Sequence, residues 1–301
     1  MLGLKRGIVE LNGNDNDRDA YTNEKGSFIQ NILKSNKSLT CKTGIFHWYG
    51  YIQPFEERIK LIKEAKYDYL MLWWEDETYP NFIDRSELMK IVSGYDLKLD
   101  NIHLPFDDAN ILWSENKIER QSQTYKIIKW LHECKKSGAN TVVMHNTQGN
   151  NHNFKYSKGY DSFNDIIKTA ENIKIKVAFE NTQMFNYTDF ILNEFKSDYA
   201  GFCYDSSHDF INGQSCGEIL SKWKERLFAV HLSDNDGTSD NHWIPGKGHV
   251  DWKKIIDIIK QTDCKSFSME TYPFEAEKEL PPFEFLIKAR ENLLTIIKDD
   301  K

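Results

Sequence analysis

Six side chains that can bind a metal ion or transfer a proton stand at the ends of six short apolar runs. They are His103, His145, Glu180, Asp205, His231 and Glu270, and the last four of these runs read VAFE, GFCYD, FAVH and SFSME. A charged group inside a buried strand is costly unless it is paired or bound to a metal. The mixture of carboxylate oxygen and imidazole nitrogen suits Mn2+, Mg2+, Co2+ or Zn2+ better than copper or an iron–sulfur cluster. The sequence therefore predicts one functional cluster built from these residues.

The runs belong to a regular alternation of strands and helices that begins near Cys41. Apolar runs predict eight strands, at residues 42–48, 67–74, 97–104, 140–145, 174–180, 200–205, 227–232 and 266–270. Helical periods lie between them, including those over 54–65, 124–138 and 252–261. Eight such units match the roughly 250 residues of a (β/α)8 TIM barrel. An open doubly wound sheet alternates in the same way, but polar residues at the strand ends favour the barrel, whose active sites lie there.

Composition limits the classes of partner. The chain has 301 residues, of which 40% are hydrophobic and 28% charged, as in ordinary globular proteins. Its formal net charge of −7 disfavours broad attraction to phosphate backbones, so nucleic acid is not an expected partner. The five cysteines include no CxxC pair and no apolar stretch approaches 18 residues, so we expect a cytoplasmic protein with reduced thiols and no membrane partner. Residues 1–40 lack the alternation and are predicted to be an N-terminal extension of a barrel domain over 41–301.

Several longer motifs are specific in combination. FENTQ (179–183), CYDSSHDF (203–210), VHLSDNDG (230–237), DNHWIPGKGHVDW (240–252) and METYP (269–273) resemble the sugar phosphate isomerase/epimerase family of the xylose isomerase-like TIM barrel superfamily. The resemblance extends over about residues 41 to 296. It implies one divalent ion held by Glu180, Asp205, His231 and Glu270. It also implies that His103 and His208 approach the substrate. The expected partner is a small sugar or sugar phosphate.

Isomerisation or epimerisation removes a proton from a carbon beside a carbonyl, and a divalent ion stabilises the resulting enediolate as a Lewis acid. Glu180 and Glu270 are the expected acid–base pair: one takes the proton, and the other returns one to the neighbouring carbon or to the opposite face. Further substrate contacts are predicted for His145, His242, Lys247 and Trp48. Lys247 belongs to the PGKG segment, where it could equally be a solvated loop lysine, and Trp48 could equally pack at the rim.

Two other activities on the same barrel stay open. Abasic-site nucleases of the endonuclease IV type hold three zinc ions, and all nine of their ligand positions have counterparts here: His103, His145, Glu180, Asp205, His208, His231, Asp240, His242 and Glu270. This chain has Asp240-Asn241-His242 where that class has Asp-Arg-His, and its opening strand reads GIFHWYGY. Leu-Pro-Phe follows His103 as in the sugar enzymes, which therefore remain the preferred class. A polyol dehydratase is the other alternative, and a non-catalytic sugar-binding barrel is a weaker one. Barrels of this kind often form homo-oligomers.

Overall fold

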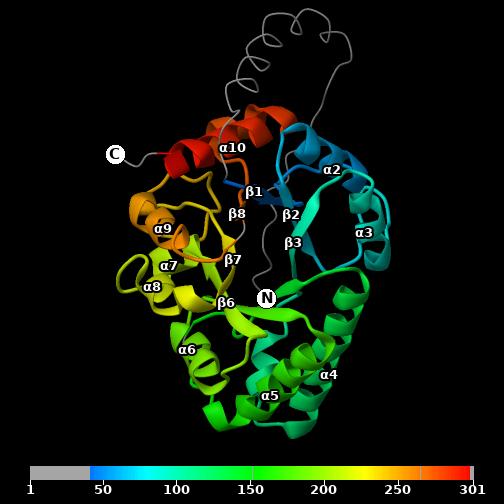
Figure 1. Cartoon of the computed structure of the whole chain (residues 1–301), viewed down its shortest axis with the longest axis vertical. Helices are drawn as coiled ribbons and strands as arrows, with labels where there is room; N and C mark the ends of the chain where they lie inside the picture. The colour runs from blue at the N-terminus through cyan, green and yellow to red at the C-terminus, as the bar shows by residue number, and fades with distance from the viewer. Residues whose placement is uncertain (1–40, 151, 265, 299–301) are drawn as a thin grey trace, which may run out of the picture.

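The computed structural model describes residues 41–150, 152–264 and 266–298, so the predicted extension over residues 1–40 lies outside the described residues. Eight strands alternate with helices around a central axis (Figure 1). The strands are β1 (Thr43–Phe46), β2 (Tyr69–Trp73), β3 (Lys98–His103), β4 (Thr141–His145), β5 (Lys176–Glu180), β6 (Ala200–Asp205), β7 (Leu227–His231) and β8 (Phe267–Met269). Each predicted strand is confirmed, mostly with slightly shorter ends.

All neighbouring strands are parallel, and the order around the sheet is β7-β6-β5-β4-β3-β2-β1-β8. The remaining gap between β7 and β8 is closed by a parallel bridge between Leu232 and Met269. Two backbone hydrogen bonds accompany it: Leu232 N donates to Ser268 O at 2.9 Å, and Glu270 N donates to Leu232 O at 3.2 Å. The predicted (β/α)8 barrel is therefore confirmed, and the alternative of an open doubly wound sheet is excluded.

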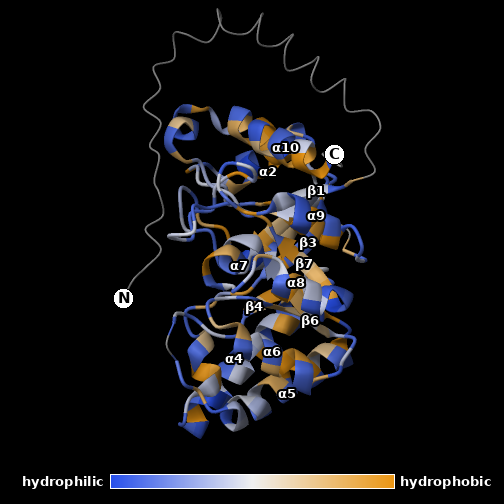
Figure 2. Cartoon of the chain, turned by 90° about the vertical axis from the view of Figure 1, so that its left-hand side faces the viewer, coloured by the Kyte–Doolittle hydropathy of each residue, from blue (hydrophilic) through white to orange (hydrophobic). Residues whose placement is uncertain are grey.

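An outer layer of helices covers the strands. It consists of α2 (Phe55–Glu64), α3 (Arg85–Ser93), α4 (Lys117–Lys136), α5 (Tyr156–Ile173), α6 (Phe185–Glu194), α7 (Ser206–Asn212), α8 (Glu218–Trp223), α9 (Trp252–Ile259) and α10 (Pro282–Lys298), with short 3-10 turns at η1 (Ala109–Trp113), η2 (Lys224–Arg226) and η3 (Glu275–Glu279). Figure 2 shows apolar residues concentrated along the strands and hydrophilic residues over much of the helices. No helix in the described part of the chain combines the length and the apolar character needed to cross a membrane.

Local signals explain where the helices begin and end. The predicted helix over 124–138 is longer at its start, because the Asn116 side chain accepts a hydrogen bond from Ile118 N at 3.0 Å and caps α4 about two turns earlier. Its end is as expected, since Gly138 adopts a φ of +97° just beyond the helix. On α9, Trp252, Ile255 and Ile259 share the buried face, as the sequence period predicts.

Candidate active site

The parallel ladder that runs from β4 through β5 and β6 to β7 brings four of the predicted side chains to one end of the barrel. His145 lies opposite Glu180 in the register, and Asp205 lies opposite His231. Because alternate residues of a strand share a face, the positions two residues earlier form the next layer of the interior. That layer is a small apolar cluster of Val143, Ala178, Cys203 and Ala229. Small side chains therefore support a ring of titratable groups, and the ring opens toward the carboxyl ends of the strands.

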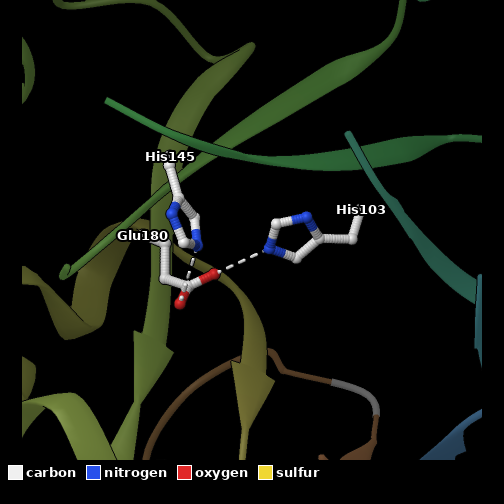
Figure 3. Close-up of side chains that lie close together, drawn as sticks. All are labelled: His103, His145 and Glu180. Carbon is white, nitrogen blue, oxygen red and sulfur yellow. Dashed lines mark hydrogen bonds and ion pairs between the residues drawn. The ribbon is translucent and has the colours of Figure 1, made fainter. Parts of the chain in front are cut away.

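Glu180 is the centre of the ring, with a side chain that is 2% exposed. Its Oε2 lies 3.2 Å from His103 Nε2 and 3.2 Å from His231 Nδ1. Its Oε1 lies 3.1 Å from His208 Nδ1 and 3.5 Å from His145 Nε2. Figure 3 shows His103 and His145 approaching this carboxylate from their separate strands. One carboxylate therefore faces four imidazoles that come from four different elements.

The predicted metal ligands Glu180, Asp205, His231 and Glu270 are brought together. One ligand atom from each of Asp205, His231 and Glu270 lies within 4.8 Å of the others. His231 Nδ1 is also 3.4 Å from Glu270 Oε2, in addition to its approach to Glu180. These side chains range from fully buried to 19% exposed, and Glu270 is the most exposed. Together with Glu180, whose Oε2 approaches the same His231 nitrogen, these residues comprise three carboxylates and one imidazole.

Asp240, His208 and His242 form a neighbouring group. His208 Nε2 lies 3.2 Å from Asp240 Oδ2, and His242 Nε2 lies 3.1 Å from the same oxygen. The Ser207 hydroxyl donates to Asp240 Oδ1 at 2.6 Å. His103, His145 and Glu180, like Asp205, His231 and Glu270, have ligand atoms within 4.8 Å of one another and could hold an ion. With Asp240, His208 and His242, the mouth of the barrel thus contains three adjoining groups of titratable side chains.

The hydrogen bonds of the imidazoles fit a bound cation. His103 Nδ1 lies 2.8 Å from Leu104 O, and His242 Nδ1 lies 3.1 Å from Glu270 O. A carbonyl oxygen only accepts, so each Nδ1 carries a proton, and each Nε2 faces a carboxylate. Such outer hydrogen bonds orient histidine ligands in metal sites. Among the described residues, neither ring nitrogen of His231 has a well-directed hydrogen bond, as would suit an ion ligand.

Burial and neighbouring charges shift the pKa values of the side chains around Glu180. Burial alone would raise the pKa of Glu180, but nearby His145 and His231 and hydrogen bonds from His103 and His145 hold that pKa well below its usual range. Burial is the main reason why the pKa of Asp205 rises to about 7. Burial also lowers the pKa of His145. Glu180 is therefore ionised at neutral pH, as a metal ligand or a base must be.

Comparison with known proteins places the fold in a family. The family described as xylose isomerase-like TIM barrel matches residues 59–286. The chain belongs to this family. An uncharacterised protein of Sinorhizobium fredii is 23% identical over 265 residues, which cover 75% of this chain and 85% of that protein.

Solved structures with the same barrel include several sugar enzymes. An L-ribulose 3-epimerase superposes with a TM-score of 0.69 and 14% identity, covering 86% of this chain and 95% of that one. A D-tagatose 3-epimerase-like protein gives a TM-score of 0.68 with 19% identity, covering 85% and 97%. The IOLI protein, solved with a zinc atom, gives 0.67 with 16% identity, covering 85% and 98%. At these identities, the likeness establishes the fold that the xylose isomerase-like barrel shares with them.

Aromatic rings flank two of the histidines. Phe106 stacks on His145 with ring centroids 4.1 Å apart and planes at 7°. Trp73 stacks on His103 with centroids 5.1 Å apart and planes at 26°. Both rings are half-buried, so they hold the imidazoles and line one side of the mouth. Trp73 ends β2, and Phe106 follows the end of β3 by three residues. These positions beside strand ends are the sequence signal that indicates them.

Two of the predicted substrate contacts, Trp48 and Lys247, have their described contacts outside the three groups of titratable side chains. Trp48 is half-buried with the Arg58 guanidinium 5.0 Å from its ring centroid, and Arg58 in turn bonds Glu77. Lys247 is exposed in a turn closed by its backbone N–H, which donates to Ile244 O at 3.1 Å. By contrast, the predicted contacts His103, His145, His208 and His242 all belong to the three groups described above.

Proposed function

We propose that the chain is a divalent-metal-dependent isomerase or epimerase of sugars or sugar phosphates. The observation that carries the proposal is the approach of Glu180 and Glu270 to one nitrogen of His231, at 3.2 and 3.4 Å from separate strands. Two carboxylates on two sides of one ion position are what a proton transfer between adjacent carbons, or between the two faces of one carbon, requires. The sugar epimerases among the proteins of the same fold support this choice of substrate.

The side chains have distinct roles in this proposal. Glu180, Asp205, His231 and Glu270 hold one Mn2+, Co2+, Mg2+ or Zn2+ ion. When bound, such an ion supplies Lewis-acid stabilisation of negative charge on the substrate oxygens. One of the two glutamates takes the proton from the carbon beside the carbonyl, and the other delivers a proton to form the product. The low pKa of Glu180 keeps it ionised, so it accepts the proton most readily from a substrate whose enediolate is strongly stabilised.

The remaining predicted contacts bind and orient the sugar. His103, His145, His208 and His242 can donate or accept hydrogen bonds to hydroxyl groups at the mouth of the barrel. Lys247 and Trp48 would contact the outer part of the substrate. The aromatic faces of Trp73 and Phe106 offer an apolar surface beside the histidines, which suits the C–H side of a sugar.

The test is NMR of pooled aldoses, ketoses and their phosphates in D2O, with Mn2+ or Co2+ and with a chelator as the control. We expect metal-dependent uptake of deuterium at a carbon beside a carbonyl, and the signal that changes identifies the substrate. The Glu180→Gln variant should show no uptake with the same sugar. Absence of exchange in every pool, while the protein binds metal, would contradict the proposal.

A second function has one specific observation in its favour. His208 Nε2 and His242 Nε2 both face Asp240 Oδ2, at 3.2 and 3.1 Å. In this second proposal these three side chains would hold a further ion, which a one-metal isomerase does not need. With this position filled, the barrel would hold three Zn2+ ions, the arrangement of an endonuclease IV-like enzyme acting on abasic DNA. Incubation of an abasic-site duplex with the zinc-loaded protein decides between them, since only the hydrolase would cut the strand.

A further inference from the structure

The segment after β7 makes a long excursion over the mouth of the barrel. Residues 235–250 leave the barrel after Asp234 and return at the start of α9, with no helix or strand of their own beyond one bridge between Asp234 and Trp243. Asp240 and His242 both lie on this loop. Their positions beside His208 therefore depend on what holds the loop, because it lacks the ladder that fixes the strand-borne ligands.

A single carboxylate ties both ends of the loop. Asp234 is fully buried, and its Oδ1 accepts hydrogen bonds from Asn235 N at 2.9 Å and Val250 N at 3.1 Å. Its Oδ2 accepts from Gly246 N at 2.8 Å and from the Trp252 indole Nε1 at 2.7 Å. Hydrogen bonds to an ionised acceptor are roughly twice as strong as neutral ones, and a buried carboxylate is stable only while such donors surround it.

The backbone passes so close to this carboxylate that a side chain does not fit. A Cβ added at Gly248 would lie 2.4 Å from Asp234 Oδ1 and 2.1 Å from Asn235 O. A methyl group at this position would therefore push the last part of the loop away from Asp234. The close approach shows that the carboxylate and the loop are fitted to each other.

From Asp234 the contacts continue to the site. The backbone of Asp234 exchanges two hydrogen bonds of 2.9 Å with Trp243, the residue after His242. His242 O then accepts from Tyr272 N at 2.8 Å, and its Nδ1 donates to Glu270 O. The loop is thereby attached to the end of β8, where Glu270 lies.

A second route leads to Asp240. The Asn235 side chain, next to Asp234, donates through Nδ2 to Ser207 Oγ at 2.7 Å. Ser207 Oγ donates in turn to Asp240 Oδ1 at 2.6 Å. Both loop-borne ligands are thus connected to the base of the loop by short, buried or half-buried hydrogen bonds.

We infer that Asp234 is a positioning residue, which holds loop 235–250 in place and so sets Asp240 and His242 against His208 and the Glu270 strand end. Asp234 touches neither substrate nor ion in this account. The expected effect of Asp234 on turnover rests on the proposed function. Its expected effect on loop 235–250 and on the imidazoles of His208 and His242 does not.

The experiment compares the full chain with its Asp234→Asn and Gly248→Ala variants. Hydrogen exchange by mass spectrometry should show amides of residues 235–250 exchanging about tenfold faster or more in both, while the strands keep their protection. In NMR spectra of 15N-histidine-labelled protein, the signals of His208 and His242 should shift, whereas those of His103 and His145 should not. The melting curve establishes that each variant is folded.

Asp189→Asn is the matched control. Asp189 Oδ1 also accepts a hydrogen bond from a tryptophan indole, Trp223 Nε1, at the same distance of 2.7 Å, but it lies on the outer helix α6. This variant should leave the loop and all four histidine signals unchanged. Unaltered exchange of residues 235–250 in Asp234→Asn would overturn the inference, and so would a loosened loop with unchanged His208 and His242 signals. If the wild-type protein exchanges no sugar proton, the proposed function fails while these two measurements still decide the role of Asp234.

Discussion

The candidate active site has a strand-borne part and a loop-borne part that are built in different ways. Glu180, Asp205 and His231 end neighbouring strands, are about 1% exposed, and take their relative positions from the backbone ladder. Asp240 and His242 lie on an irregular loop, and the Asp240 side chain is 34% exposed. Their positions come instead from hydrogen bonds that the side chains and backbone of the loop make.

The strand-borne and loop-borne parts are suited to two different tasks. Proton transfer depends on geometry that is held within a fraction of an ångström, which a parallel ladder provides without further support. A loop can be changed without disturbing the barrel, and loops are where barrels of one fold acquire different activities. We therefore assign the chemistry to the strand-borne part and the choice of reaction and substrate to the loop-borne part.

The largest expected effect is on the strand-borne carboxylates. Glu180→Gln should lower deuterium uptake about 10²- to 10⁴-fold, because the variant lacks a proton acceptor and an ion ligand. Glu270→Gln should lower uptake for the same reason, with a smaller loss because this more exposed side chain has fewer partners. Glu194→Gln, an exposed position on α6, is the control and should be fully active. Wild-type uptake in Glu180→Gln would remove the basis of the two-carboxylate mechanism.

A smaller effect is expected in the loop-borne part, and it sharpens the distinction. Asp240→Ala should raise KM about tenfold and change kcat much less, as for a group that binds substrate and transition state alike. His145→Ala, at the end of β4 and outside this loop, should leave the isomerase ion bound, as should Asp240→Ala. Steady-state kinetics and metal analysis of both variants provide the check. Loss of all turnover together with loss of metal in either variant would favour the three-zinc hydrolase instead.

The smallest effect is on stability. Divalent metal at about 100 times its Kd should stabilise the folded chain by roughly 2.7 kcal/mol, since the unfolded chain has no assembled site. For a barrel of this size that corresponds to an increase in Tm of about 5 °C or more over the chelated protein. Asp240→Ala should keep this increase and Asp205→Ala should lose it, as a melting curve with and without chelator will show. Equal loss in both variants would contradict the division between strand and loop.

Sequence reasoning reached the strand-borne part because its signal is local. A carboxylate or imidazole that closes a continuous apolar run identifies itself, and parallel strands bring such ends together. The first strand was predicted to reach residue 48 but ends at Phe46, since the His47 side chain turns to Glu77, 3.2 Å away, on the loop after β2. That contact joins residues 30 positions apart in the sequence, so the local pattern around neither residue predicts it.

The loop-borne part was accessible only through family resemblance. Asp240 and His242 follow no apolar run, so nothing in their neighbourhood indicates a site. Asp234 could not be identified at all, because its function depends on N–H groups of residues 12 to 18 positions later converging on one carboxylate. Such convergence is a property of the folded loop and not of a local pattern.

The most direct test of the central claim is the metal content of the purified protein after dialysis against a divalent metal, measured by inductively coupled plasma mass spectrometry. The account predicts at least one tightly bound ion per chain in the wild-type protein and its loss in Glu180→Gln with the fold retained. A wild-type chain without a bound ion, or a Glu180→Gln chain with undiminished metal, would contradict it.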